Sequence, residues 1–149
     1  MSHTPLATAF MSAEDSPGFL LWQLSNKWQA AQRAALKDYD LTHVQFVLLA
    51  TLTYGAGETV FTQKRLAEYT QVDVMMTSQV VQKLESKGLV QRITNKADRR
   101  ALFVVPTPTG RELAKRVVRV VEKIDQTYFR VLGAEQGDFV AMMRRLIQQ

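Results

Sequence analysis

Apolar side chains between Asp73 and Gly88 recur at spacings of three and four residues, which is the period of an amphipathic α-helix. Asp73 suits a helix start, because its carboxylate can accept hydrogen bonds from free backbone N–H groups. Gly88 can adopt the left-handed backbone that ends a helix, with Leu89 folding back onto Leu84. The pattern predicts one helix between these two residues. Its apolar stripe consists of Thr77, Val80, Val81 and Leu84.

The opposite face of this helix carries polar or soft side chains and no acid. Amides and hydroxyls can hydrogen-bond base edges in the major groove of DNA, and methionine can touch a thymine methyl group. An ordinary solvated helix face is the alternative interpretation. The residues of this face are Met75, Met76, Ser78, Gln79, Gln82 and Lys83.

Two runs rich in β-forming residues, 89–94 and 101–105, follow the helix and predict a β-hairpin. Arginine at a hairpin tip can enter the narrow, negative minor groove of DNA. Asp98 is expected to orient one of the two arginines through a charge-assisted hydrogen bond. A charged loop that only keeps the surface solvated is the alternative. The charged tip residues are Lys96, Asp98, Arg99 and Arg100.

A second helix is predicted just upstream, over residues 63–69. Thr62 can cap it, and Phe61 can pack against Leu66 in a hydrophobic staple. A short turn, 70–72, then leads to Asp73. Helix, short turn and helix form the helix-turn-helix arrangement, in which the second helix reads DNA. The start of the first helix adds Thr62, Lys64 and Arg65 to the candidate DNA contacts.

The flanking segments predict helices that bury apolar surface. The helix that follows a capping box at Thr42 and Gln45 is apolar almost all round, so it must be buried. A long helix starting at Thr107 and Pro108 carries two apolar stripes. One stripe can pack within the protomer and the other against a second copy; a larger core in one protomer is the alternative. The stripes are Leu113, Val117, Val120, Ile124, Tyr128 and Val131, and Val118, Val121 and Phe129.

Composition narrows the functional class. The 149 residues suffice for one domain or for one protomer of a dimer. No apolar run is long enough to span a membrane and no secretory signal is evident, so a cytoplasmic protein is expected. With no cysteine and only His3 and His43, neither a metal site nor a cofactor is expected. Nucleophile elbows and phosphate-binding glycine loops are also missing, which argues against an enzyme.

The net charge is concentrated in one part of the chain. Residues 62–111 hold nine Lys and Arg against four Asp and Glu, while the remaining residues hold ten of each. The whole excess of +5 therefore lies in the segment that contains the predicted helix-turn-helix and hairpin. A basic patch attracts phosphates and gives a salt-dependent affinity for nucleic acid. Lys87 and Arg92 can instead pair with neighbouring acids such as Glu85.

The order and spacing of several short motifs resemble the MarR family of winged-helix transcription regulators over roughly seventy residues. Lys96 departs from the pattern, because the family often has proline before the wing tip. The matching residues are Leu41-Thr42-x-x-Gln45-Phe46, Leu66-Ala67, Ser78, Leu84-Glu85-x-Lys87-Gly88-Leu89-Val90-x-Arg92, Asp98-Arg99-Arg100 and Thr107-x-x-Gly110.

The resemblance implies a mainly α (α+β) fold. Residues 42–111 would form a winged helix-turn-helix lobe with a two-stranded β-wing, and residues 18–38 and 112–149 would form dimerisation helices. A homodimer would bind a pseudo-palindromic operator in double-stranded DNA, usually as a repressor, with its reader helices about 34 Å apart. The expected DNA contacts are Thr62, Lys64, Arg65, Met75, Met76, Thr77, Ser78, Gln79, Gln82, Lys83, Lys96, Asp98, Arg99 and Arg100.

The resemblance also implies a small aromatic or anionic effector, bound between the dimerisation helices and the lobe. Trp22, His43 and Phe46 are the candidate lining residues, with a nearby Arg or Lys for an anion. The alternative for Trp22 and Phe46 is a plain core position.

Two other functions remain open at this point. A winged helix can serve as a protein-interaction module, although the concentrated positive charge argues against that use. A non-specific architectural protein would show salt-dependent DNA binding without a preferred sequence.

Overall fold

The computed structural model describes residues 11–55 and 60–149, so His3 lies outside the described residues. The helices and strands are α1 (Pro17–Leu36), α2 (His43–Tyr54), β1 (Phe61–Thr62), α3 (Gln63–Thr70), α4 (Val74–Ser86), β2 (Val90–Thr94), β3 (Leu102–Pro106), α5 (Pro108–Phe129) and α6 (Gln136–Ile147). Short 3-10 turns at Ala13–Asp15, Lys37–Tyr39 and Arg130–Glu135 adjoin α1 and α6.

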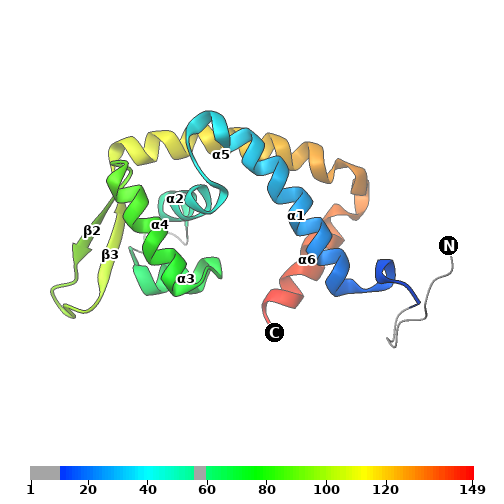
Figure 1. Ribbon diagram of the computed structural model, residues 1–149, viewed down its shortest axis with the longest axis horizontal. Coiled ribbons are helices and arrows are strands. Elements are labelled where there is room, and N and C mark those ends of the chain that lie inside the picture. Colours follow the sequence, from blue (N-terminus) through cyan, green and yellow to red (C-terminus); the bar gives the residue numbers. More distant parts are fainter. Residues whose placement is uncertain (1–10, 56–59) are drawn as a thin grey trace.

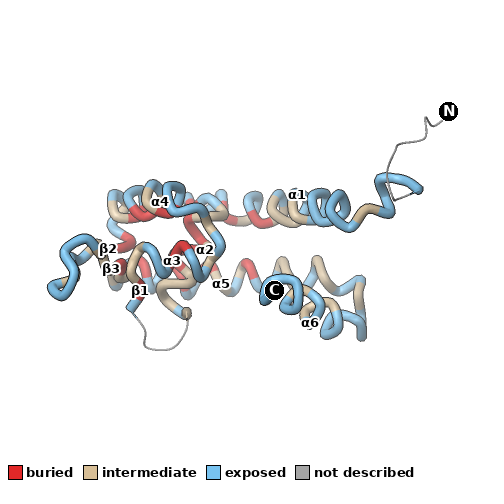
Figure 2. Tube along the Cα trace, turned by 90° about the horizontal axis from the view of Figure 1, so that it is seen from below, coloured by how far each residue is buried: buried red, intermediate tan, exposed pale blue. Residues whose placement is uncertain are grey.

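The elements form two regions joined by a long helix (Figure 1). A lobe at one end contains α2, α3, α4 and the sheet, and α5 runs from this lobe to α1 and α6 at the other end. Buried residues gather in the lobe, whereas α6 and the first half of α1 are largely exposed (Figure 2). The winged helix-turn-helix fold and its flanking helices are thus confirmed as predicted.

Helix α2 forms the centre of the lobe. Its side chains at Leu48 and Leu49 are fully buried, and the helix contacts α1, α3, α4, α5 and β3. The predicted capping box is present: the Thr42 hydroxyl accepts from the backbone N–H of Gln45, and the Gln45 side chain accepts from that of Thr42, both at 3.2 Å. A helix that is apolar on every side can only be stable when neighbours surround it, as they do here.

The sheet has three antiparallel strands in the order β1-β3-β2, one more than the two-stranded wing that was expected. Phe61 pairs with Val104 and Thr62 with Phe103. A two-residue strand is too short to show the alternating pattern that marks strands in sequence. Thr62 still caps α3, since its hydroxyl accepts from the Arg65 backbone N–H at 3.1 Å.

Both predicted ends of α4 are confirmed. The Asp73 carboxylate accepts from the backbone N–H groups of Met75 and Met76 at 3.0 and 3.1 Å. At the other end Gly88 has a φ of +76°, and the backbone N–H of Leu89 donates to the Leu84 carbonyl at 3.0 Å. These caps fix where the helix starts and stops, and hence which of its residues reach the surface.

A tight joint connects the turn after α4 to the start of α5. The Thr107 hydroxyl donates to the Gly88 carbonyl at 2.7 Å and accepts from the Gly110 backbone N–H at 3.0 Å, while the Thr107 backbone N–H donates to the Leu89 carbonyl at 3.0 Å. A Cβ atom on Gly110 would lie 2.0 Å from the Leu89 carbonyl oxygen, so no side chain fits at this position.

Replacing Gly110 by alanine should therefore lower the free energy of unfolding by about 1–3 kcal/mol, because α5 must shift away from the Leu89 backbone. Denaturant unfolding followed by circular dichroism measures this. Gly137→Ala is the matched control: its Cβ meets open space in α6, and alanine there changes stability by at most about 1 kcal/mol, in the favourable direction. Equal stability of the two variants would contradict the close packing.

Candidate nucleic-acid interface

The two faces of α4 have different environments. Thr77, Val81 and Leu84 are buried in the lobe core, whereas Met75 and Met76 are 71% and 48% exposed. Gln79, Gln82 and Lys83 are exposed and Ser78 is half-buried. The acid-free face predicted from the sequence is therefore on the outside of the lobe, where it can meet a groove of DNA.

One predicted contact on this helix is wrong. Thr77 is 0% exposed, and its hydroxyl lies 3.5 Å from the Val72 carbonyl inside the turn between α3 and α4. Its methyl group continues the apolar stripe formed with Val81 and Leu84. Because Thr77 occupies the core side of the helix, it supports the position of α4 and is out of reach of DNA.

The start of α3 and the wing approach the start of α4. A hollow of about 400 Å³ is lined by Thr62 at the end of β1, Lys64 from α3, Val74 from α4, and Asp98 and Arg100 from the wing, among others. Lys64 and Arg65 are exposed, while Thr62 is half-buried and engaged as a cap. Cations from α3 and from the wing thus lie on the same side of the lobe as the start of α4.

The wing tip is held by its own polar side chains. Asn95 accepts from the backbone N–H of Ala97 at 2.9 Å, and Asp98 accepts from the backbone N–H of Arg100 at 3.0 Å. The Asp98 carboxylate also lies 3.4 Å from Nε of Arg100, so the expected orienting bond is confirmed for that arginine. Lys96 and Arg99 are exposed and form no ion pair with any residue that the structure describes.

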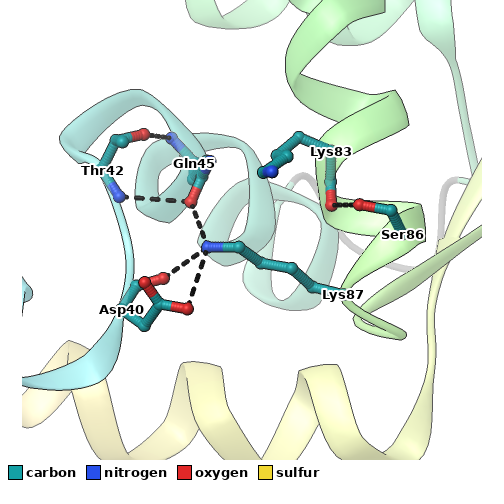
Figure 3. Close-up of polar contacts among 6 residues, drawn as sticks. All are labelled: Asp40, Thr42, Gln45, Lys83, Ser86 and Lys87. Atoms are coloured by element: carbon teal, nitrogen blue, oxygen red, sulfur yellow. Dashed lines mark hydrogen bonds and ion pairs between the residues drawn. The ribbon is translucent and has the colours of Figure 1, made fainter.

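Two lobe cations are used inside the protein. Arg92 holds Glu85 through its guanidinium at 2.9 and 3.1 Å and through its backbone N–H at 3.0 Å. The side-chain bonds, followed by the backbone bond, keep the pKa of Glu85 below its usual value. Lys87 turns toward Asp40 and Gln45 (Figure 3). Neither side chain is therefore free to contact a phosphate. The pairing predicted between Arg92 and Glu85 is confirmed.

The three candidate effector residues are not brought together. Trp22 is 67% exposed near the start of α1, and Phe46 is 7% exposed within the core cluster. His43 is half-buried and lines a hollow of about 450 Å³ between α1, α2 and the α3–α4 turn. Arg33 lines the same hollow and was not identified from the sequence, although an arginine near this site was expected. Trp22 and Phe46 are not part of it.

A polar network surrounds His43. Its ring meets Trp28 edge-on with centroids 5.0 Å apart. The Asp125 carboxylate on α5 accepts from Nε1 of Trp28 at 2.9 Å and from Nε2 of the buried Gln32 at 2.7 Å. Burial of the imidazole is the main reason why the pKa of His43 lies below its usual value; the charge of Arg33 acts in the same direction and Asp125 opposes it.

The depressed pKa of His43 makes stability depend on pH. The folded state binds fewer protons at this site than the unfolded state, so stability is complete above the ordinary value of 6.5 and is lost as pH falls below it. Thermal unfolding between about pH 7.5 and pH 5.5, above most carboxylate titrations, should show this loss. His43→Gln should flatten the profile; an unchanged profile would show that His43 is not the group responsible.

Within residues 11–55 and 60–149, no cluster of three His, Cys, Asp or Glu residues is placed to hold a metal ion. In the same part of the chain, every helix is too short or too polar to cross a membrane.

These features define a winged helix-turn-helix transcriptional regulator, and comparisons with known proteins identify its family. A profile of the MarR family matches residues 41–102. The chain is 42% identical to YdcH of Bacillus subtilis, an uncharacterized HTH-type transcriptional regulator, over 93% of this chain and 95% of that protein. The chain belongs to the MarR family.

Two further similarities agree with this placement. A regulatory protein assigned provisionally to the hcr operon of Thauera aromatica is 35% identical, over 92% of this chain and 86% of that protein. The solved structure of BpsR from Bordetella bronchiseptica, whose DNA binding is regulated by 6-hydroxynicotinic acid, superposes with a TM-score of 0.84 at 27% identity. It covers 93% of this chain and 97% of that chain.

Proposed function

We propose that this regulator is a homodimer that binds a pseudo-palindromic operator in double-stranded DNA and represses transcription until a small aromatic acid releases it. The observation that carries the proposal is the arrangement of the lobe. The exposed, acid-free face of α4 lies beside a cationic wing tip and the cationic start of α3. A groove-sized rod flanked by cations matches both the shape and the charge of a duplex.

Dimerisation is proposed from the apolar surface at the far end of the molecule. Exposed apolar side chains on α1 and α6 include Leu21, Leu146 and Ile147. Between α1, α6 and the end of α5 lies an apolar hollow of about 350 Å³, lined in part by Phe129 and Phe139. Apolar surface of this extent calls for a partner. We propose that a second copy covers it, through residues 18–38 and 112–149, which leaves residues 42–111 as the DNA-binding lobe.

The inner side of α5 supports this division. Ala114, Val117 and Val121 are buried in the lobe core, so the buried stripe combines Val117 from one predicted stripe with Val121 from the other. Val131, beyond the end of α5, is 89% exposed. The first half of α5 therefore packs within the protomer, and we propose that a second copy covers the exposed apolar surface beyond the end of the helix.

Within the interface, each kind of residue has its own role. Gln79, Gln82 and Ser78 can hydrogen-bond base edges, and Met75 and Met76 can contact thymine methyl groups. Lys64, Arg65 and Lys83 can neutralise phosphates, and Arg99 and Lys96 can follow the minor groove at the wing. As a DNA-binding regulator of a bacterial family, the protein would act in the cytoplasm.

Arg99→Ala should weaken binding to a selected operator and lower the slope of log affinity against log salt by about 1 per protomer, because one cation leaves the duplex. Fluorescence anisotropy over a salt series measures both quantities. Arg116→Ala on α5 is the control, since it removes the same charge at an exposed residue outside the proposed DNA contacts. Operator binding by Arg99→Ala that equals that of the control would show that the wing does not contact DNA.

Gln79→Ala and Gln82→Ala should change which bases are preferred more than the overall attraction to DNA, because amides read base edges and carry no charge. Selection from a random duplex library, run in parallel for the parent and both variants, gives the preferences. Identical enriched sites in all three would contradict the reader-helix assignment. Salt-dependent binding without any enriched site in the parent would indicate an architectural protein. No binding of the parent to DNA at low salt would indicate a protein-interaction module.

The effector is proposed to occupy the hollow lined by His43 and Arg33. This hollow touches α1 and the lobe together, so a ligand there can favour one orientation of the lobe over another. A larger hollow of about 770 Å³ lies between α2, α3 and α5, where it does not touch α1. Arg33 supplies a charge for a carboxylate, and the similarity to BpsR supports an aromatic acid as ligand class.

Arg33→Gln should raise the concentration of aromatic acid needed to release the operator by about tenfold or more, since a charge-assisted contact is lost. A panel that contains 6-hydroxynicotinate and benzoate, titrated into the protein–operator complex, measures release. Lys37→Gln, just beyond α1 and outside the lining of the hollow, should respond as the parent does. Equal responses of Arg33→Gln and the parent would place the effector elsewhere.

A further inference from the structure

Lys87 immediately follows α4 and points into the protein (Figure 3). Its Nζ lies 2.5 Å from the Asp40 carbonyl oxygen, 3.0 Å from Oε1 of Gln45 and 3.6 Å from the Asp40 carboxylate. The side chain is only 21% exposed. Two hydrogen bonds and one ion pair thus direct the ammonium group toward the corner between α1 and α2.

The oxygens that Lys87 holds belong to the corner between α1 and α2. Asp40 adopts left-handed backbone, with a φ of +53°, in the turn after Lys37–Tyr39. Oε1 of Gln45 also accepts from the backbone N–H of Thr42, which closes the capping box of α2. One oxygen therefore serves both the start of α2 and the end of α4, and the lysine fastens the reader helix to the corner that leads into α1.

The Lys87 contacts lie at one end of α4, so a small change of angle there moves the other end of the helix further. Helix α4 has 13 residues and is therefore about 20 Å long. Lys87 holds its carboxyl end, while Met75 and Met76 lie at the opposite end of the helix. A tilt of about 10° at the fastened end moves the other end by about 3.5 Å, which is about the rise of one base pair. Small changes at the corner thus become changes of one base-pair step at the DNA.

We propose that Lys87 is a positioning residue that sets the distance between the two half-sites the dimer accepts, without contacting DNA itself. The proposal rests on the dimeric DNA-binding function proposed above. Base preference comes from side chains on the outer face of α4, and the half-site distance comes from the angle at which each α4 leaves the α1–α2 corner. Loss of the Lys87 contacts frees that angle, so that operators with altered spacing become acceptable.

Lys87→Met tests the proposal, because methionine keeps most of the aliphatic stem and removes the ammonium group. The substrate is the operator selected by the parent, together with versions that have one base pair more or fewer between the half-sites. The parent should prefer its own spacing by about tenfold or more. Lys87→Met should lose most of that preference, while its half-site base preference and its salt slope stay parental.

Lys83→Met is the matched contrast, one turn earlier on the same helix. Lys83 is exposed and is placed among the phosphate contacts. Its loss should lower affinity at every spacing equally and reduce the salt slope by about 1 per protomer, with the spacing preference intact. Opposite signatures from the same substitution at two neighbouring lysines distinguish positioning from direct contact.

Several results would overturn the inference. Parental spacing preference in Lys87→Met, or a fall in its salt slope like that of Lys83→Met, would show that Lys87 does not act by positioning. A parent that binds its operator without any spacing preference would also overturn it, while leaving DNA binding intact. A parent that binds no selected duplex would instead refute the proposed function. Should Lys87→Met fail to fold by circular dichroism, Lys87→Gln, which keeps a donor but no charge, carries the same measurement.

Discussion

The burial of α2 is the constraint on which the rest of the structure depends. This helix has no polar face to offer to water, so α1, α3, α4, α5 and β3 must surround it. Val81 and Leu84 bury the inner side of α4 in the same core, and the outer side is left to solvent. The outer face of α4, which we propose reads DNA, is therefore exposed because the opposite face belongs to the hydrophobic core.

Much of this fold could be predicted, because its signals are local. Helix caps depend on residues three or four apart, and Asp73, Thr62 and Thr107 act where their types predict. The third strand could not be found, since two residues carry no period and Phe61 gains its partner from a segment some forty residues away. In the sequence, Gly110 stood out only as a position of the family motif. A glycine is needed there because the Leu89 backbone approaches it closely, and this is a tertiary contact.

The candidate site shows the same division between local and tertiary information. The exposed face of α4 followed from its period, but Thr77 was placed on both faces, because a threonine suits core and groove alike. Lys87 was expected either to join the basic patch or to pair with an acid such as Glu85, but the fold places two oxygens of Asp40 and one of Gln45 beside it. For the effector, the family resemblance suggested Trp22, His43 and Phe46, whereas the fold brings Arg33 to His43 by packing α1 on α2.

The joint at Thr107 and Gly110 has a mechanical consequence. With the Leu89 carbonyl pressed against Gly110 and the Thr107 hydroxyl bridging to Gly88, there is no slack between the hairpin and α5. The β2–β3 hairpin and α5 must then move together as one rigid unit. A rotation of α5 would then carry the β2–β3 hairpin with it (Figure 1).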